Sequence, residues 1–397
     1  MPRTQLPAAV AALVLLLGAC APGARHPVAP VPLPVAAVAE SEPAPEVVSA
    51  PEPAALEKAA PTPEPQGILG TATYDLPVTD NRWVEMELDF LVTQRHEVIA
   101  RWLANAERFG AWVQDVFARH GLPRDLHHLA MVESGYSPHA RSRAGAVGMW
   151  QFMRGTGRMM GLRVDTLVDE RMDPVRATHA AARHLLQLHR QFGRDWALAA
   201  AAYNAGGGRI GRALGRTGAR DFWELSVRGD LAQETRRYVP RLYAVTIIAK
   251  DPARFGFAAP QVPARPFAYD SVRVDLLTPL AVLARLGSVP LDLLAELNPH
   301  LLRQAAPAGY WVWVPAGEGA ALQRAYVDSE FRRRGGHAFY TVRAGDDLAT
   351  LAEVGAVPVE EIRELNLSRN LDRLSRGERL RLPADAARAL AARPRSR

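Results

Sequence analysis

The sequence predicts a mainly helical protein that ends in two small α+β units. From Asn81 to Lys250, apolar side chains recur at helical spacing and no segment alternates as a strand would. From about residue 267 the chain repeats itself with an offset of 68 residues. Residues 21–66 hold 12 of the 31 prolines and no aromatic residue, so this segment cannot bury enough apolar surface to fold.

Composition narrows the class of partner. The 397 residues carry a net charge of +6, with a pI of about 9.7, which raises nucleic acid as a partner. The basic residues are scattered, however, and the first twenty residues are typical of an exported protein. We therefore expect no nucleic-acid partner.

The first twenty residues predict export. Arg3 gives a positive start, and Ala8–Leu17 form an apolar run too short to remain as a membrane-spanning helix. The following Leu17–Cys20 resembles the lipobox of bacterial lipoproteins, which implies that residues 1–20 are a signal peptide. It also implies that Cys20, the only cysteine, is lipidated.

The expected location is the periplasm, with a lipid anchor. Ala21 rather than aspartate follows Cys20, which in these signals implies the outer membrane. With one cysteine there is no disulfide, so the folded domains depend on burial alone. Residues 21–72 are expected to be a disordered tether, because Tyr74 is the first aromatic residue of the chain.

Glu133 is the candidate catalytic residue. Leu122, Leu126 and Leu129 fall at helical spacing, and Glu133 continues the series four residues later, at the end of a short helix that opens at Pro123. A carboxyl group against an apolar face loses hydration, which raises its pKa toward neutrality, as a general acid requires. The alternative is a glutamate rotated into solvent at a helix end.

Three further helices are predicted. One covers 177–192 and carries His179, His184 and His189, whose spacing of five scatters them around the helix, so no metal site is expected. Another includes Trp196 to Tyr203 and ends at the glycines that follow Ala205. The last runs from Gln233 to about Lys250.

Four motifs in order carry a family resemblance. They are Glu133-Ser134, Gly148-Met149-Trp150-Gln151, Ala202-Tyr203-Asn204-Ala205-Gly206 and Glu234-Thr235 with Tyr238. Together they resemble the soluble-lytic-transglycosylase domain, with the membrane-bound lytic murein transglycosylase D type as the nearest pattern. The resemblance implies a lysozyme-like, goose-type helical catalytic domain, assigned to residues 73–258. It also implies cleavage of the MurNAc–GlcNAc bond of peptidoglycan glycan strands, leaving 1,6-anhydromuramyl ends, without cofactor or metal.

The same resemblance implies roles for the site residues. Glu133 would be the catalytic acid and base, since the nucleophile is the muramyl C6 hydroxyl and no water must be activated. Tyr238 would hydrogen-bond near Glu133. The remaining expected substrate-binding residues are Ser134, Ser142, Gly148, Met149 (through its backbone), Gln151, Tyr203 and Asn204.

The repeated C-terminal units resemble LysM modules, each a strand, two short helices and a closing strand. The unit at 337–384 opens with a good motif that contains Gly345-Asp346, and the resemblance implies that it binds peptidoglycan. The unit at 265–316 lacks that pair and is either a second glycan binder or a structural spacer. Residues 385–397 are expected to be a disordered tail.

Two other functions stay open at this point. The chain could be a catalytically silent wall-binding lipoprotein, although a pure binder has no need of an acid at Glu133. It could also be a lysozyme-type hydrolase in which Asp165, Asp169 or Asp173 helps water to attack.

Overall fold

The computed structural model describes residues 67–228, 231–258, 264–366 and 369–393. The predicted signal peptide, the lipidation of Cys20 and the tether up to residue 66 lie outside the described residues. Within those residues, no helix is both long enough and apolar enough to cross a membrane.

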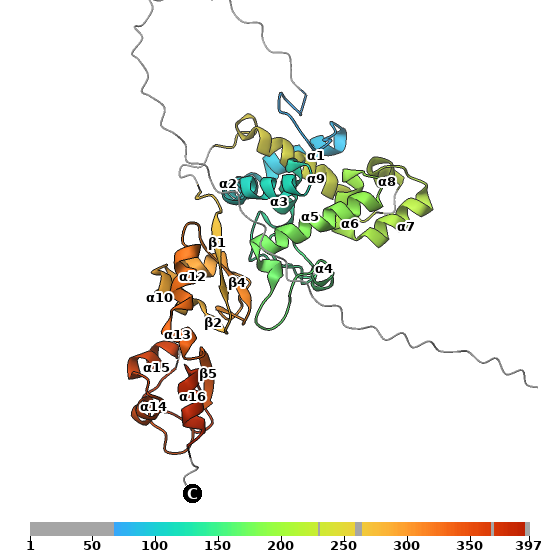
Figure 1. The fold of residues 1–397 in the computed structure, drawn as a ribbon. Coiled ribbons are helices and arrows are strands. Elements are labelled where there is room, and N and C mark those ends of the chain that lie inside the picture. Colours follow the sequence, from blue (N-terminus) through green and yellow to red (C-terminus); the bar gives the residue numbers. More distant parts are fainter. Residues whose placement is uncertain (1–66, 229–230, 259–263, 367–368, 394–397) are drawn as a thin grey trace, which may run out of the picture. The chain divides into compact units, whose positions relative to one another are not determined.

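The first part of the chain is helical, as predicted (blue to yellow in Figure 1). Its helices, with 3-10 turns marked η, are α1 Arg82–Gln94, α2 His96–Arg119, η1 Arg124–His127, α3 His128–Ser134, α4 Arg154–Met159, η2 Glu170–Met172, α5 Pro174–Gln191, α6 Trp196–Ala205, α7 Gly207–Thr217, α8 Phe222–Arg228, α9 Gln233–Lys250 and η3 Pro252–Phe255.

One hydrophobic core holds these helices together. The alanine-rich α6 packs against α5 and α9, and all its residues from Ala197 to Ala202 are buried. Small side chains let the neighbouring helices approach closely. Helix α1 packs along α9, where buried Glu87 forms ion pairs with Arg237 and Arg241. This pairing offsets the cost of burying the Glu87 carboxylate.

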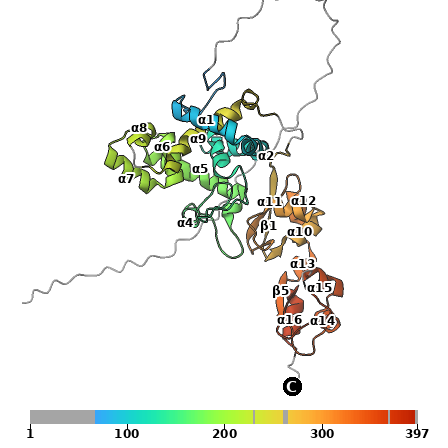
Figure 2. The same cartoon turned by 180° about the vertical axis from the view of Figure 1, so that it is seen from behind.

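The C-terminal part contains the two predicted repeats (orange to red in Figures 1 and 2). The first repeat comprises β1 Tyr269–Val274, β2 Thr278–Pro279, α10 Leu280–Gly287, α11 Leu291–Leu297, β3 Ala305–Ala306 and β4 Tyr310–Pro315, followed by α12 Gly319–Val327 and α13 Glu330–Arg333. The second comprises β5 His337–Thr341, α14 Leu348–Gly355, α15 Val359–Leu365, β6 Arg379–Pro383 and α16 Ala384–Ala391.

The repeats share their strand register and one buried hydrogen-bonding residue. Tyr269 pairs with Pro315 in the first, and His337 pairs with Pro383 in the second, both in antiparallel sheets. Asn298 donates to the carbonyl of Trp313 and accepts from its N–H. Asn366, 68 residues later, bonds the backbone of Arg381 in the same way. The repeated Glu-Leu-Asn sequence therefore ties each second helix to its closing strand.

Several predicted boundaries were wrong. The expected tail at 385–397 begins within α16, whose Leu390 is fully buried in the core of the second repeat. The expected tether reaches too far, because Ile68 and Leu69 pack against the helical core and Tyr74 donates to the Leu69 carbonyl. Apolar side chains in both segments therefore bury surface that composition alone did not assign to a core.

Two more boundaries differ from expectation. The first repeat continues past residue 316, since Leu322 and Tyr326 of α12 belong to its core. The segment from Pro123 is not one helix, because a 3-10 turn, η1, precedes the short α3. The apolar face nevertheless forms, with Leu122, Leu126 and Leu129 all buried.

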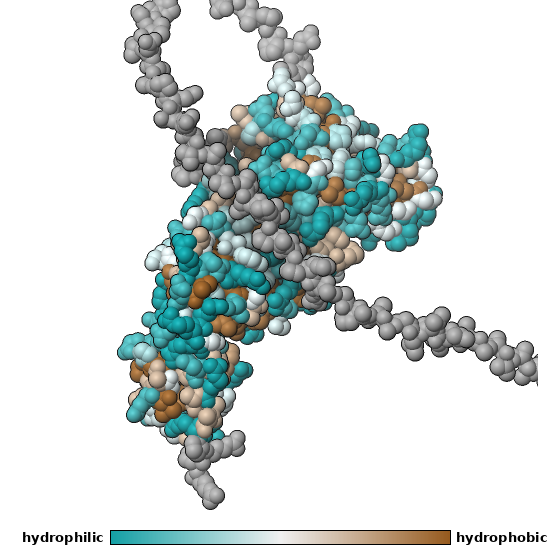
Figure 3. All heavy atoms as spheres, viewed as in Figure 1, coloured by the Kyte–Doolittle hydropathy of each residue, from teal (hydrophilic) through white to brown (hydrophobic). Residues whose placement is uncertain are grey.

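On the face shown in Figure 3, hydrophobic residues lie scattered among hydrophilic ones. Large exposed apolar side chains are spread along the described chain, from Met86 and Met159 to Val227 and Phe339. Isolated exposed apolar groups of this kind are normal on a folded surface.

Candidate active site

Glu133 lies in the last turn of α3, which ends at Ser134 and is capped by Gly135. Gly135 adopts the left-handed conformation (φ +59°), and a Cβ there would come within 2.2 Å of the Trp102 ring. Only glycine therefore fits this helix end. Asn105 of α2 donates its side-chain amide to the Gly135 carbonyl at 2.8 Å. Helix α2 thus fixes the position at which α3 presents Glu133.

The surroundings of Glu133 favour its protonated form. The side chain is half-buried, and burial raises its pKa from 4.5 to about 7. The Tyr238 hydroxyl donates a hydrogen bond to Oε1, which opposes this rise, whereas the charge of Glu234 adds to it. A carboxyl group with this pKa both gives and accepts a proton near neutral pH.

Two other helices contribute residues to the site. Helix α9 contributes Tyr238 and Glu234, and helix α6 contributes Tyr203 and Asn204. Tyr238 is buried, and its pKa is raised well above 10 by burial and by the nearby Glu133 carboxyl. Burial raises the pKa of Tyr203, and the charge of Glu133 adds to this rise. Tyr203 donates to the Trp150 carbonyl at 2.8 Å, and Asn204 accepts from the Thr235 hydroxyl at 2.9 Å.

The loop from residue 145 to residue 152 joins this group through main-chain contacts. Ser134, next to Glu133, donates its hydroxyl to the Met149 carbonyl at 2.8 Å. Gly148 adopts φ +85°, and a Cβ there would overlap the Arg171 carbonyl at 1.8 Å. Gln151 also has a positive φ of 46° and donates its amide to the Gly148 carbonyl at 2.8 Å. The loop is therefore held between α3 and the η2 turn.

The predicted residues differ in what they can offer a substrate. Met149 has a buried side chain and Gly148 has none, so these residues contribute through their backbone. Gln151 and Asn204 are half-buried and retain hydrogen-bonding groups, the Oε1 of Gln151 and the Nδ2 of Asn204, that no described residue satisfies. Ser142 is exposed, and its hydroxyl accepts the Ala146 N–H, with no contact to Glu133.

Sequence reasoning missed three residues that fix the site. Trp102 and Asn105 hold Gly135 from about thirty positions away along the chain, and no local pattern announces such a contact. Arg171 was missed as well, although its guanidinium donates to the carbonyls of Gly145 and Phe152, both at 3.1 Å. The one available signal in the sequence was an arginine close to three acidic residues, Asp169, Glu170 and Asp173.

The three aspartates considered as catalytic helpers have structural partners instead. Asp165 accepts the backbone N–H groups of Leu167 and Val168. Asp169 forms a buried ion pair with Arg171, and Asp173 accepts two N–H groups at the start of α5. Across the described residues, no group of three or more His, Cys, Asp or Glu side chains could hold a metal ion.

Two cavities, of about 360 and 390 Å³, lie elsewhere in the molecule. One lies between α2 and α11, and the other is lined by residues of both repeats. Neither is lined by Glu133 or by Tyr238. The perturbed carboxyl group and the hydrogen bonds around it, rather than cavity size, identify the candidate site.

Comparisons with known proteins indicate the family of the chain. Residues 117–226 match the family model described as the transglycosylase SLT domain. The membrane-bound lytic murein transglycosylase D of Escherichia coli (strain K12) is 32% identical over 314 residues, which cover 74% of this chain and 66% of that protein. The soluble lytic murein transglycosylase of the same strain is 26% identical over 174 residues, or 42% of this chain and 26% of that protein.

Among solved structures, the 70 kDa soluble lytic transglycosylase of Escherichia coli aligns with 33% of this chain and 23% of its own, at 28% identity and a TM-score of 0.30. The chain spans about two thirds of the length of its D-type relative. The family resemblance predicted from the four motifs is confirmed by the sequence matches. The chain belongs to the lytic transglycosylases that carry an SLT domain.

Proposed function

We propose that this chain is a peptidoglycan lytic transglycosylase that cleaves the MurNAc–GlcNAc β-1,4 bond and leaves a 1,6-anhydromuramyl end. The observation that carries the proposal is Glu133, half-buried, with a pKa of about 7 and a hydrogen bond from Tyr238. The matching relatives are named lytic murein transglycosylases, which supports the same reaction.

Glu133 acts first as a general acid. Its protonated carboxyl donates to the oxygen that links the two sugars as the bond from muramyl C1 to that oxygen breaks. The departing N-acetylglucosamine takes the proton as a new hydroxyl group, and positive charge develops at C1. The carboxylate that remains is stabilised by the Tyr238 hydroxyl.

Glu133 then acts as a general base. The muramyl C6 hydroxyl attacks C1, and its proton returns to the carboxylate as the anhydro ring closes. Atoms and charge balance without a water molecule, so one carboxyl serves both steps. A pKa near 7 suits this exchange, because neither form of the group is strongly disfavoured.

The remaining residues divide into two roles. Gln151 and Asn204 bind sugar groups, since both are half-buried and have free hydrogen-bonding capacity among the described residues. Ser134 and Tyr203 act indirectly, because their hydroxyl groups hold the carbonyls of Met149 and Trp150 and so fix the loop beside Glu133.

Two rival functions are less well supported. A catalytically silent glycan binder would have no use for a carboxyl group held near its neutral form. A hydrolase would require a second carboxylate to activate water. Glu234 would be the candidate for that role, because its charge acts on Glu133. The products distinguish hydrolysis from transglycosylation, since hydrolysis leaves a reducing muramic acid.

We further propose that the protein is anchored in the cell envelope at both ends. The second repeat is the LysM-type glycan binder: the Tyr340 hydroxyl and the Arg343 N–H both donate to Asp346, which shapes its opening turn. At the other end, lipidated Cys20 attaches the chain to the outer membrane on its periplasmic side. The name of the D-type relative, which includes "membrane-bound", supports an envelope location.

Digestion of purified sacculi tests the reaction. The released fragments are reduced with borohydride and weighed by mass spectrometry, with Glu133→Gln as the matched control. We expect fragments that resist reduction and lack the mass of one water, and none from the variant. Fragments that are reducible at muramic acid would refute transglycosylation, and equal release by the variant would refute the role of Glu133.

A further inference from the structure

The first repeat is joined to the helical domain by a buried contact that includes several charged side chains. Two backbone hydrogen bonds connect them, one from the Asp169 N–H to the His300 carbonyl and one from the Leu302 N–H to the Leu167 carbonyl, and together they form a β-bridge between Val168 and Leu301. Both hydrogen bonds measure 3.0 Å. A loop of the repeat is therefore paired with residues 167–169 like a short strand.

Side chains of the repeat complete a set of buried charges beside this bridge. Trp313 donates its indole N–H to Asp173 at 2.9 Å, and Tyr310 donates its hydroxyl to Glu170 at 2.7 Å. Arg176 forms ion pairs with both acids and lies 4.5 Å from the centres of the Tyr310 and Trp313 rings. Asp173 is fully buried, so the loss of a donor would leave its charge poorly satisfied.

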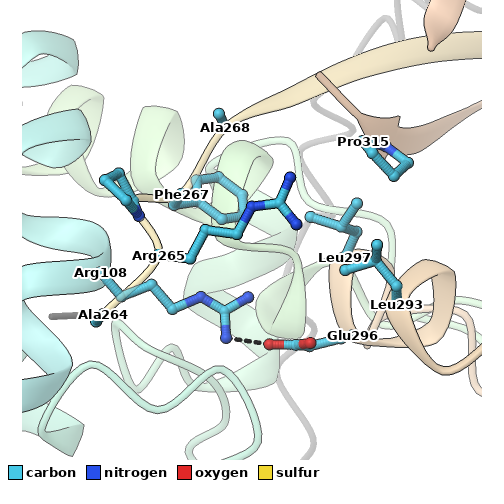
Figure 4. A pocket seen from close by; sticks show the side chains of 10 residues that line it. Arg108, Ala264, Arg265, Phe267, Ala268, Leu293, Glu296, Leu297 and Pro315 are labelled. Atoms are coloured by element: carbon cyan, nitrogen blue, oxygen red, sulfur yellow. Dashed lines mark hydrogen bonds and ion pairs between the residues drawn. The ribbon is translucent and has the colours of Figure 1, made fainter. Parts of the chain in front are cut away.

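A second contact fastens the repeat to α2. Figure 4 shows Arg108 of α2 paired with Glu296 of α11. Leu293 and Leu297 lie on the same side of the cavity as Glu296. Phe267, which precedes β1, donates its backbone N–H to the Arg108 carbonyl. Its ring packs against that of Phe109, with 5.1 Å between the ring centres. The repeat is thus held at two separated places on the helical domain, which prevents it from turning about a single contact.

Comparison with the second repeat shows that these contact residues are special to the first. Sixty-eight residues on, the positions of Leu301, Tyr310 and Trp313 are occupied by Arg369, Glu378 and Arg381. The second repeat pairs Arg369 with Glu378 at its own surface. The two copies share a fold, but the second has charged residues at these three positions, and its exposed aromatic residue Phe339 packs against Arg379 and Arg381.

The docked segment leads directly to the candidate site. Arg171 follows Glu170, and its guanidinium binds Asp169 on one side and the carbonyls of Gly145 and Phe152 on the other. The Arg171 carbonyl lies against Gly148. A continuous set of contacts therefore runs from the first repeat through 169–173 to the loop at 145–152 beside Glu133.

We propose that the first repeat is a fixed part of the catalytic unit, in which Trp313 and Tyr310 are positioning residues that hold residues 169–173, and through Arg171 the 145–152 loop, in their working conformation. It is not a separately moving glycan-binding module. The proposal rests on the proposed function only where catalytic activity is measured.

The test compares the full chain with Trp313→Arg, which installs the side-chain type of the second repeat. The matched control is Arg381→Ala in the second repeat. Hydrogen exchange of the peptide covering 145–152 is measured first, because it reports the loop without reference to any activity. We expect faster exchange there and at 165–173 in Trp313→Arg, and no change in the control.

Activity on soluble glycan strands is measured next. We expect kcat/KM to fall about ten- to hundredfold in Trp313→Arg through lost alignment of the loop, while retention on sacculi is unchanged. Tyr310→Phe keeps the ring but removes the bond to Glu170, so it should show a smaller change of the same kind. If Trp313→Arg does not fold, Tyr310→Phe decides the question.

Unchanged exchange at 145–152 in the variants would overturn the proposal. So would a repeat that unfolds in a separate thermal transition in the wild-type protein. If the wild type proves inactive, the proposed function fails, while hydrogen exchange and unfolding still test the docking.

Discussion

Replacement of Glu133 by glutamine changes both the chemistry and the pH dependence of stability. Glutamine has nearly the same shape, and its Oε1 still accepts the Tyr238 hydroxyl, so the fold is retained. It cannot donate or receive the catalytic proton. A positioned general acid contributes about 10²- to 10⁴-fold to a rate, so at least that much activity should be lost.

The stability effect follows from the raised pKa of Glu133. The pKa is 4.5 in the unfolded chain and about 7 in the folded one, so between these values the folded state binds more protons. Stability of the wild type therefore falls as the pH rises through this window. At about 1.4 kcal/mol per pKa unit, the penalty above pH 7 reaches at most about 3 kcal/mol, and residual exposure of the half-buried side chain reduces it.

Urea unfolding of the wild type and Glu133→Gln, followed by tryptophan fluorescence at several pH values, measures this penalty. The variant should be the more stable protein above neutral pH, by up to about 3 kcal/mol, and the difference should vanish below a pH of about 4.5. A difference that does not depend on pH would refute the raised pKa. Full residual release of muropeptides would refute the catalytic role.

Three other perturbations probe separate parts of the account. Tyr238→Phe removes the donor that stabilises the Glu133 carboxylate, so the alkaline limb of kcat/KM should move to higher pH; an unshifted limb would contradict this. Asn105→Ala frees the Gly135 carbonyl, and kcat should fall about tenfold at a stability cost of about 1 kcal/mol; an unchanged kcat would show that α2 does not position Glu133. Deletion of 337–397, which includes all of the second repeat, should weaken retention on sacculi without slowing cleavage of soluble fragments; undiminished retention would rule out glycan binding by this repeat.

Much of the helical domain could be read from the sequence because its signals are local. The alanine and leucine content of α5 and α6 and the limits of α9 follow from propensity and spacing over a few turns. The repeat could also be recognised from the sequence, since Asn298 and Asn366 stand 68 residues apart and make the same hydrogen bonds. What is repeated along the chain can be recognised without knowing the fold.

The contacts that complete the site could not be read in this way. The hydrogen bond between Asn105 and Gly135 depends on how α2 and α3 come together. In the sequence, Asp169 and Asp173 resemble catalytic helpers, whereas in the structure they bind Arg171 and Trp313. The segment after β6 looked like a tail because only tertiary packing reveals where Leu390 goes.

The source of the oxygen at the new muramyl end tests the central claim most directly. Sacculi are digested in water enriched in heavy oxygen, and the released fragments are weighed. If Glu133 passes one proton to the leaving sugar and recovers another from the muramyl C6 hydroxyl, the fragments contain no solvent oxygen. Heavy oxygen at muramyl C1 would mean that water is the nucleophile, and the single-carboxyl mechanism would be wrong.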